Sequence, residues 1–169
     1  PIYAKQLGIS DAEIGLIASA YAAALFVSTY IFGRLADTIG RRPLIISGLI
    51  LSSVSFFLYI FVHDFTSMFL IRAVSGIAIS MQASALIAYA HDVGHKLGKL
   101  SSFDALGIAT GSVIIGLIAA NLSVAATFMM SAIFFLAAFF VSLRLEKSGY
   151  KRIKVSLFPR HILKKNLAV

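Results

Sequence analysis

The sequence contains no cysteine and no tryptophan, and only 13% of its 169 residues are charged. Without cysteine, the chain can form no disulfide, no zinc–thiolate site and no cysteine nucleophile. A typical soluble domain has about 25% charged residues and about half apolar ones. Here 59% of the residues are hydrophobic. The composition therefore excludes an ordinary water-soluble domain, and it excludes disorder, which requires low hydrophobicity and high charge.

Long runs without charged residues are the main feature of the sequence. Residues 14–32, 43–62 and 73–90 lack Asp, Glu, Lys and Arg, and so does the longer run 105–143. A helix needs about 20 mainly apolar residues to cross the hydrocarbon core, so the longest run fits two spans joined by a turn near 121–123. We therefore predict an all-α membrane protein with one helix bundle over 1–143. Its five expected spans are residues 12–32, 43–62, 65–90, 103–120 and 122–143.

Most basic residues lie on one side of the predicted bundle. The segments 33–42, 91–102 and 144–169 carry Lys and Arg, whereas the opposite side carries only Lys5. Because Lys and Arg concentrate in cytoplasmic loops, we expect these segments in the cytoplasm and the protein in the cell membrane, crossing it several times. The net charge of +8 then reflects orientation in the lipid bilayer, and nucleic-acid binding need not be invoked.

The two ends of the sequence are those expected inside a longer protein. The chain begins with Pro1 on the predicted outer side, and another apolar run starts within 157–169. We expect at least one further helix before this sequence and more membrane sequence after it. Residues 144–169 would then be a basic cytoplasmic linker toward the second part.

Small residues recur at helical spacing in the predicted spans, a pattern that lets helix backbones approach closely in lipid. Gly76 begins such a series in 73–90, and Gly107, Gly111 and Gly116 form another in 103–120. We expect these glycines at helix–helix contacts within the bundle.

The segment 33–44, Gly-Arg-Leu-Ala-Asp-Thr-Ile-Gly-Arg-Arg-Pro-Leu, joins the first two predicted spans. Gly40 suits a turn that requires a positive φ. Asp37 lies near the end of its helix, where the macrodipole disfavours an anion. Its carboxylate therefore requires a cation or the N-terminus of another helix. On charge alone, Arg41 and Arg42 would be solvated positive-inside residues.

This segment resembles the signature loop between the second and third helices of the major facilitator superfamily of secondary transporters. The matching residues are Gly33, Leu35, Asp37, Gly40, Arg41 and Arg42, whereas Thr38 replaces the usual basic residue. The resemblance implies that Asp37 and Arg41, the first arginine of the matching pattern, latch the two halves of the transporter on the cytoplasmic side and stabilise the outward-open state. The partner of Asp37 would be a helix end in the C-terminal half.

A second resemblance, to the fourth helix of the same family, covers 68–78 and centres on Arg72. Arg72 lies about 10 Å inside the membrane, at 1.5 Å per residue. It either snorkels to the interface or faces the bundle interior, which we favour because intramembrane charges are usually functional. In the family this Arg is implicated in proton coupling or in holding polar groups of the substrate site. Gln82 is a candidate for lining a substrate path, with a helix–helix hydrogen bond as its alternative role.

Asp92 follows the same span and resembles an acidic residue that pairs with the signature loop in the family. We expect Asp37, Arg41 and Asp92 to form a charge cluster on the cytoplasmic side. The glycines of 103–120 also match part of the fifth-helix antiporter pattern of the family, with Ser112 where Pro is usual.

The resemblance covers nearly the whole chain and implies helices two to six of twelve, in the N-terminal half of a transporter that works by alternating access. Its partners would be the bilayer, a small-molecule substrate, a coupling ion, most often H⁺, and the C-terminal half of the same chain. We favour a proton-coupled exporter of amphipathic compounds. An importer of sugars or metabolites is one alternative, and a non-transporting scaffold or receptor subunit is another. The sequence shows no catalytic set or cofactor motif, so we predict no enzyme activity, cofactor or metal site.

Overall fold

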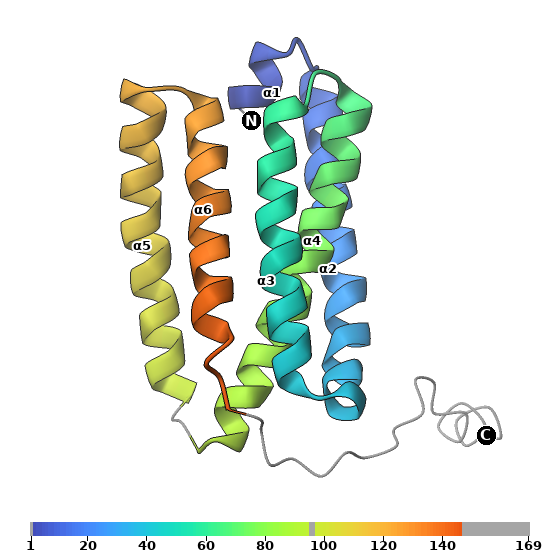
Figure 1. The fold of residues 1–169 in the computed structure, drawn as a ribbon. Helices are drawn as coiled ribbons and strands as arrows, with labels where there is room; N and C mark the ends of the chain where they lie inside the picture. Colours follow the sequence, from blue (N-terminus) through green and yellow to red (C-terminus); the bar gives the residue numbers. More distant parts are fainter. Residues whose placement is uncertain (1, 95–96, 147–169) are drawn as a thin grey trace, which may run out of the picture.

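The computed structural model describes residues 2–94 and 97–146, and every regular element in these residues is helical (Figure 1). The expected linker 144–169 lies outside the described residues beyond Glu146. Five helices are long and apolar enough to cross a membrane, which confirms the predicted all-α membrane fold. The elements are α1 (Ile2–Gln6), α2 (Asp11–Ile39), α3 (Arg41–Leu58) continued by a 3₁₀ turn η1 (Tyr59–Phe61), α4 (Phe65–Asp92), α5 (Leu97–Asn121) and α6 (Val124–Ser142).

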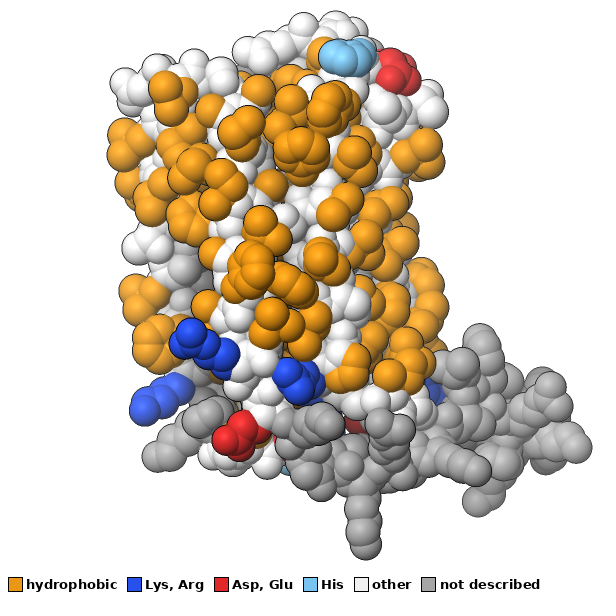
Figure 2. Space-filling view, in the orientation of Figure 1, with side chains coloured by type: hydrophobic (Ala, Val, Ile, Leu, Met, Phe, Trp, Pro, Cys, Tyr) orange, Lys and Arg blue, Asp and Glu red, His pale blue; other side chains and the backbone are white. Residues whose placement is uncertain are grey.

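The long helices stand side by side, with α2, α3 and α4 grouped together and α5 and α6 beside them (Figure 1). The short helix α1 lies at one end of the bundle. The opposite end, which holds the α2–α3 turn, the end of α4 and the segment after α6, is called the basic end. Figure 2 shows hydrophobic side chains over the middle of one face and Lys and Arg side chains gathered toward the basic end. This distribution matches a bundle that exposes apolar side chains to lipid and charged ones to water.

Side-chain caps fix where three of the long helices begin. Ser10 and Glu13 form a capping box at α2, with Ser10 N–H donating to Glu13 Oε2 at 2.9 Å. Asp64 caps α4 by accepting from the backbone N–H groups of Thr66 and Ser67. Ser123 Oγ accepts from Ala126 N–H at 3.1 Å at the start of α6. The turn between α5 and α6 lies in the stretch 121–123, where the sequence placed it.

The connection between the first two spans is much shorter than the predicted loop 33–42. Helix α2 continues to Ile39 and α3 starts at Arg41, so that Gly40 alone separates them. The prediction was wrong because it ended the helix at the first charged residue, and a helix leaving a membrane keeps its hydrogen bonds in water. For the same reason α5 begins at Leu97, before the predicted start at 103.

The core changes character along the bundle. Two hydrophobic clusters lie at its ends: Tyr59 and Met68 belong to the one beside α1, and Leu44 and Tyr89 to the one at the basic end. Between them the buried residues are mostly small, and the hydroxyl groups of Ser55, Ser75 and Ser80 donate to carbonyls of their own helices. The small buried residues are Ser52, Ser55, Ser75, Gly76 and Ser80. Small residues permit close backbone approach in lipid, so the middle of the bundle is held by tight helix contact.

Candidate functional site

The tightest turn of the bundle brings charged residues to the basic end. Gly40 has a φ of +107°, a conformation that costs a residue with a side chain much more than glycine. Its N–H donates to the carbonyl of Ala36 at 3.2 Å and closes α2. Asp37 in the last turn of α2 and Arg41 in the first turn of α3 therefore stand next to each other.

Arg41 is the centre of the candidate site. Its Nη2 lies 3.5 Å from Asp37 Oδ1, and its Nη1 contacts both Asp92 Oδ2 and the carbonyl of Ala88. The Arg41 side chain is only 8% exposed, the Asp92 side chain 15% and the Asp37 side chain 37%. We call Arg41, Asp37, Asp92 and the Ala88 carbonyl the Arg41 cluster. The structure thus brings together the three residues that the sequence grouped.

Helix dipoles explain why these charges need one another. Asp37 and Asp92 lie at the C-terminal ends of α2 and α4, where an anion is disfavoured, and Arg41 lies at the N-terminal end of α3, where a cation is disfavoured. Each placement costs free energy alone, and the contacts between opposite charges offset that cost. Because Arg41 is buried, losing one of its two carboxylate partners removes an ion pair from a low-dielectric site, where such a loss is costly.

Arg42 lies in the same turn as Arg41 but contacts the end of a different helix, α6. Its Nη2 donates to the carbonyl of Leu143 at 2.7 Å, just beyond the end of α6. Basic side chains stabilise helix C-termini by satisfying free carbonyls. Leu145 then packs against the hydrophobic cluster at the basic end. The two arginines therefore tie the ends of α4 and α6 to the α2–α3 turn.

Arg34 and Thr38, the other polar residues of the segment, make local contacts. Arg34 donates to Tyr30 Oη at 2.8 Å, and Thr38 Oγ1 donates to the carbonyl of Leu35 at 3.0 Å. A side chain at Gly33 would meet nothing within 4 Å, so this face of α2 is open among the described residues. Within residues 2–94 and 97–146, no three His, Cys, Asp or Glu side chains lie where they could hold a metal ion.

Two polar side chains of α4 lie against neighbouring helices. Arg72 is half-buried, and its guanidinium carbon lies 5.1 Å from the centre of the Tyr21 ring on α2. Gln82 Nε2 donates to Ser52 Oγ on α3 at 3.3 Å. The contact of Gln82 favours the helix–helix hydrogen bond over the substrate path as its role.

The α3–α4 crossing depends on Gly48, which the sequence reasoning missed. A Cβ atom on Gly48 would lie 2.8 Å from Gln82 N and 3.1 Å from the carbonyl oxygen of Ala78. Ser53 on the same helix donates to the carbonyl of Ala132 on α6 at 2.8 Å. The sequence does contain a feature that could have predicted this crossing. Gly48 and Ser52 are small residues four positions apart, and this spacing marks close helix contacts.

The glycines of α4 and α5 differ in how closely other helices approach them. Gly76 on α4 lies against α2, where an added Cβ would meet the carbonyl oxygen of Tyr21 at 2.8 Å. At Gly107, Gly111 and Gly116, an added Cβ would meet nothing within 4 Å, and α5 has no buried residue. Within the described residues these three glycines make no close helix contact, and α6 faces Gly107 and Gly111 only across a cavity.

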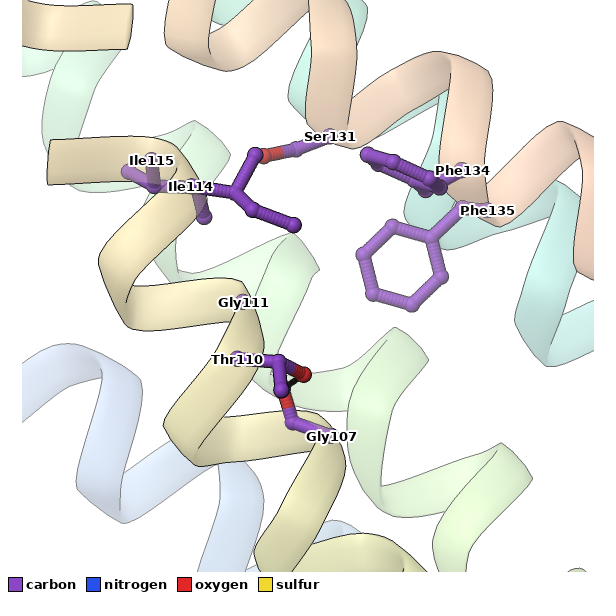
Figure 3. A pocket seen from close by; sticks show the side chains of 8 residues that line it. All are labelled: Gly107, Thr110, Gly111, Ile114, Ile115, Ser131, Phe134 and Phe135. Atoms are coloured by element: carbon purple, nitrogen blue, oxygen red, sulfur yellow. Dashed lines mark hydrogen bonds between the residues drawn. The ribbon is translucent and has the colours of Figure 1, made fainter. Parts of the chain in front are cut away.

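A cavity of about 340 Å³ lies between α5 and α6. Gly107 and Gly111 leave space on the α5 side, and Figure 3 shows Ile114, Ser131 and Phe135 around that space. The hydroxyls of Thr110 and Ser131 donate to carbonyls of their own helices at 2.7 and 2.8 Å. The cavity is therefore apolar in character, and its position is separate from the Arg41 cluster.

Comparison with known proteins identifies the family of this chain. Residues 1–167 match the pattern of the Major Facilitator Superfamily. The chain is 32% identical over 103 residues to the quinolone resistance protein NorA of Staphylococcus aureus, covering 61% of this chain and 26% of that protein. It is 32% identical over 124 residues to an uncharacterized MFS-type transporter of Methanocaldococcus jannaschii, covering 70% of this chain and 32% of that protein. The chain thus spans a quarter to a third of the length of these relatives. Because the family pattern extends over nearly all of its residues, the chain belongs to the Major Facilitator Superfamily.

Proposed function

We propose that this chain carries the conformational latch of a secondary active transporter, and that the complete protein exports small amphipathic compounds in exchange for protons. The observation that carries the proposal is the buried Arg41 cluster, which joins the ends of α2, α3 and α4. The direction of transport is supported by the similarity to a protein whose name describes quinolone resistance. The protein is an integral membrane protein that crosses the bilayer several times.

The cluster can act as a latch because its ion pairs form in only one arrangement of the helix ends. Separating Arg41 from Asp92 would leave buried charges unpaired, at a cost on the order of 3–5 kcal/mol. A bias of this size moves a two-state equilibrium almost completely to one side, since about 5.5 kcal/mol converts 1:99 to 99:1. The Arg41 cluster would thus hold one conformation of the alternating-access cycle until another interaction replaces it.

Asp37 is the member of the cluster that is able to take a further partner. Its side chain is 37% exposed and its distance to Arg41 is the longer of the two ion pairs. The relatives are three to four times as long as the matched segments. We infer that a helix end in the second half of the complete transporter contacts Asp37 in the latched state.

The test uses the complete transporter in liposomes with an imposed proton gradient. The measured quantities are the flux of a fluorescent amphipathic dye and the internal pH. Dye movement against the proton flow supports the proposal. Dye and protons moving in the same direction would indicate an importer, and a gradient that drives no dye or metabolite would overturn transport by this mechanism.

Charge reversal tests the latch itself. Arg41→Asp and Asp92→Arg, each made alone, should lower the flux by roughly tenfold or more because each leaves like charges in a buried site. The double variant restores opposite charges and should recover most of the flux. Arg144→Gln removes a basic residue that is exposed at the same end, and it should leave the flux unchanged. Failure of the double variant to recover, when it reaches the membrane at normal levels, would contradict the pairing.

A further inference from the structure

Arg72 is a cation placed inside an apolar layer. It lies seven residues along α4 from Phe65, which is about 10 Å at 1.5 Å per residue. Its side chain is half-buried, and no Asp or Glu of the described ranges forms an ion pair with it. A charge at this depth is costly, and a long side chain lowers that cost by extending toward water unless something holds it.

The guanidinium group of Arg72 lies over the ring of Tyr21. The guanidinium carbon lies 5.1 Å from the ring centre, within the roughly 6 Å over which a cation is attracted to the face of an aromatic ring. Tyr21 is half-buried and belongs to α2, so the contact joins two different spans. The attraction is stronger away from water, which is where this pair lies.

Gly76 creates the space that this contact requires. It lies one turn beyond Arg72 on α4 and is buried. An added Cβ at Gly76 would meet the Tyr21 carbonyl oxygen at 2.8 Å and Tyr21 Cδ2 at 3.3 Å. The backbone of α2 therefore packs directly on α4 at Gly76, and this packing sets where the Tyr21 ring lies.

We propose that Tyr21 is a positioning residue for Arg72, and that its ring fixes the guanidinium at the α2–α4 interface. This inference rests on the proposed transport function, in which Arg72 meets a proton-carrying group or a polar group of the substrate. The ring holds the cation at a set depth instead of letting it extend to the membrane surface. Gly76 acts through Tyr21, because a larger residue there would push α2 and its ring away.

A double-mutant cycle on the complete transporter in proton-loaded liposomes tests the proposal. With Arg72 present, Tyr21→Leu should lower kcat/KM for the amphipathic dye by about tenfold, the effect of losing one buried cation–π contact. Tyr21→Phe keeps the ring and should retain most of the rate. In an Arg72→Gln background, Tyr21→Leu should change kcat/KM less than about twofold, because a cycle isolates the pair interaction. Phe26→Leu, which removes a highly exposed aromatic residue from the same helix, is the matched control.

Two outcomes of the cycle would overturn the proposal. Equal losses from Tyr21→Leu in both backgrounds would show that Tyr21 only supports packing. A loss with Tyr21→Phe as large as with Tyr21→Leu would assign the effect to the hydroxyl group.

A second measurement separates this proposal from the transport function. Solid-state NMR of the arginine-labelled protein should show a ring-current shift at Arg72, assigned by its loss in Arg72→Lys. The shift should disappear in Tyr21→Leu and remain in Tyr21→Phe. If wild-type protein transports nothing but shows this pattern, the transport function fails and the positioning of Arg72 stands. If the shift is absent from wild-type protein, the positioning fails whatever the flux.

Discussion

At the scale of single residues, the surroundings of a glycine decide what it contributes. Gly48 on α3 faces the backbone of α4, whereas Gly116 on α5 faces open space among the described residues. Alanine normally stabilises a helix by about 1 kcal/mol relative to glycine. At Gly48 an added methyl group would meet backbone atoms at 2.8 and 3.1 Å, and such atoms cannot yield without moving the helix.

We therefore expect Gly48→Ala to destabilise the protein, by about 1–3 kcal/mol as in overpacked cores. The measurement is thermal unfolding of the detergent-solubilised complete protein. Gly116→Ala is the control and should leave the unfolding temperature unchanged or raise it. Equal effects of the two substitutions would contradict the close approach of α3 and α4.

Asp64 links the stability of α4 to pH. Its carboxylate accepts from the Ser67 hydroxyl at 2.5 Å and from the backbone N–H groups of Ser67 and Thr66. The Ser67 hydroxyl and backbone hydrogen bonds are the main reasons that the pKa of Asp64 lies below its usual value. A pKa that is lower in the folded than in the unfolded protein stabilises the fold above the unfolded value, about 3.9, and this stabilisation is lost as pH falls through the lower folded value.

The corresponding prediction compares wild-type protein with Asp64→Asn, which keeps a capping side chain but does not titrate. The difference in unfolding temperature between the two should be constant from about pH 7 to pH 5 and should shrink below about pH 4, since the carboxylate then becomes protonated. Unfolding in detergent at a series of pH values measures this difference. A difference independent of pH would show that the carboxylate charge does not contribute to the cap.

At the scale of elements, hydropathy located the helices but not their full lengths or their contacts. The five spans were predictable because each apolar run is long enough to cross a membrane. The extension of α2 to Ile39 was not, because hydropathy does not distinguish a helix in water from a loop. The contacts of Arg42 with Leu143 and of Tyr21 with Arg72 join distant parts of the chain. Neither pair follows a helical spacing, so only the packing of whole helices brings them together.

The contact of Arg42 with α6 gives a prediction about local opening. Arg42→Gln should increase amide hydrogen exchange around the end of α6, over 139–145, because the Leu143 carbonyl loses its cationic donor. A hydrogen bond to a charged group contributes about 1.5–3 kcal/mol, so exchange should rise by roughly tenfold or more. Mass spectrometry of the complete protein in detergent measures the change.

Lys99→Gln provides the matched control for this exchange experiment. Lys99 is a basic residue near the start of α5 whose side chain is exposed. Its substitution should leave exchange at 139–145 unaltered. If both variants exchange alike at this segment, then Arg42 does not anchor α6, and Leu145 alone holds the segment to the hydrophobic cluster.

At the scale of the whole molecule, the helices form one tightly joined group and one loosely joined helix. α4 packs extensively on both α2 and α3, and α6 packs on α3, whereas α5 contacts α6 and α4 only lightly. The Arg41 cluster lies within the tight group, and Arg42 extends its hold to α6. The contacts of α2, α3, α4 and α6 therefore form one continuous group, and the Arg41 cluster lies at its basic end.

The charge distribution of these helices gives a prediction about the orientation of the complete protein in the membrane. The basic end carries the Arg41 cluster, whereas the turn between η1 and α4 carries His63 and Asp64 but no Lys or Arg. Because Lys and Arg are retained in the cytoplasm during insertion, Thr38 should face the cytoplasm and His63 the exterior. This sequence contains no cysteine, so Thr38→Cys or His63→Cys in an otherwise cysteine-free complete protein gives a single reactive site. A membrane-impermeant maleimide should label His63→Cys on intact cells and Thr38→Cys only after permeabilisation. The reverse pattern would place the latch outside the cell, where a cytoplasmic latch between transporter halves could not operate.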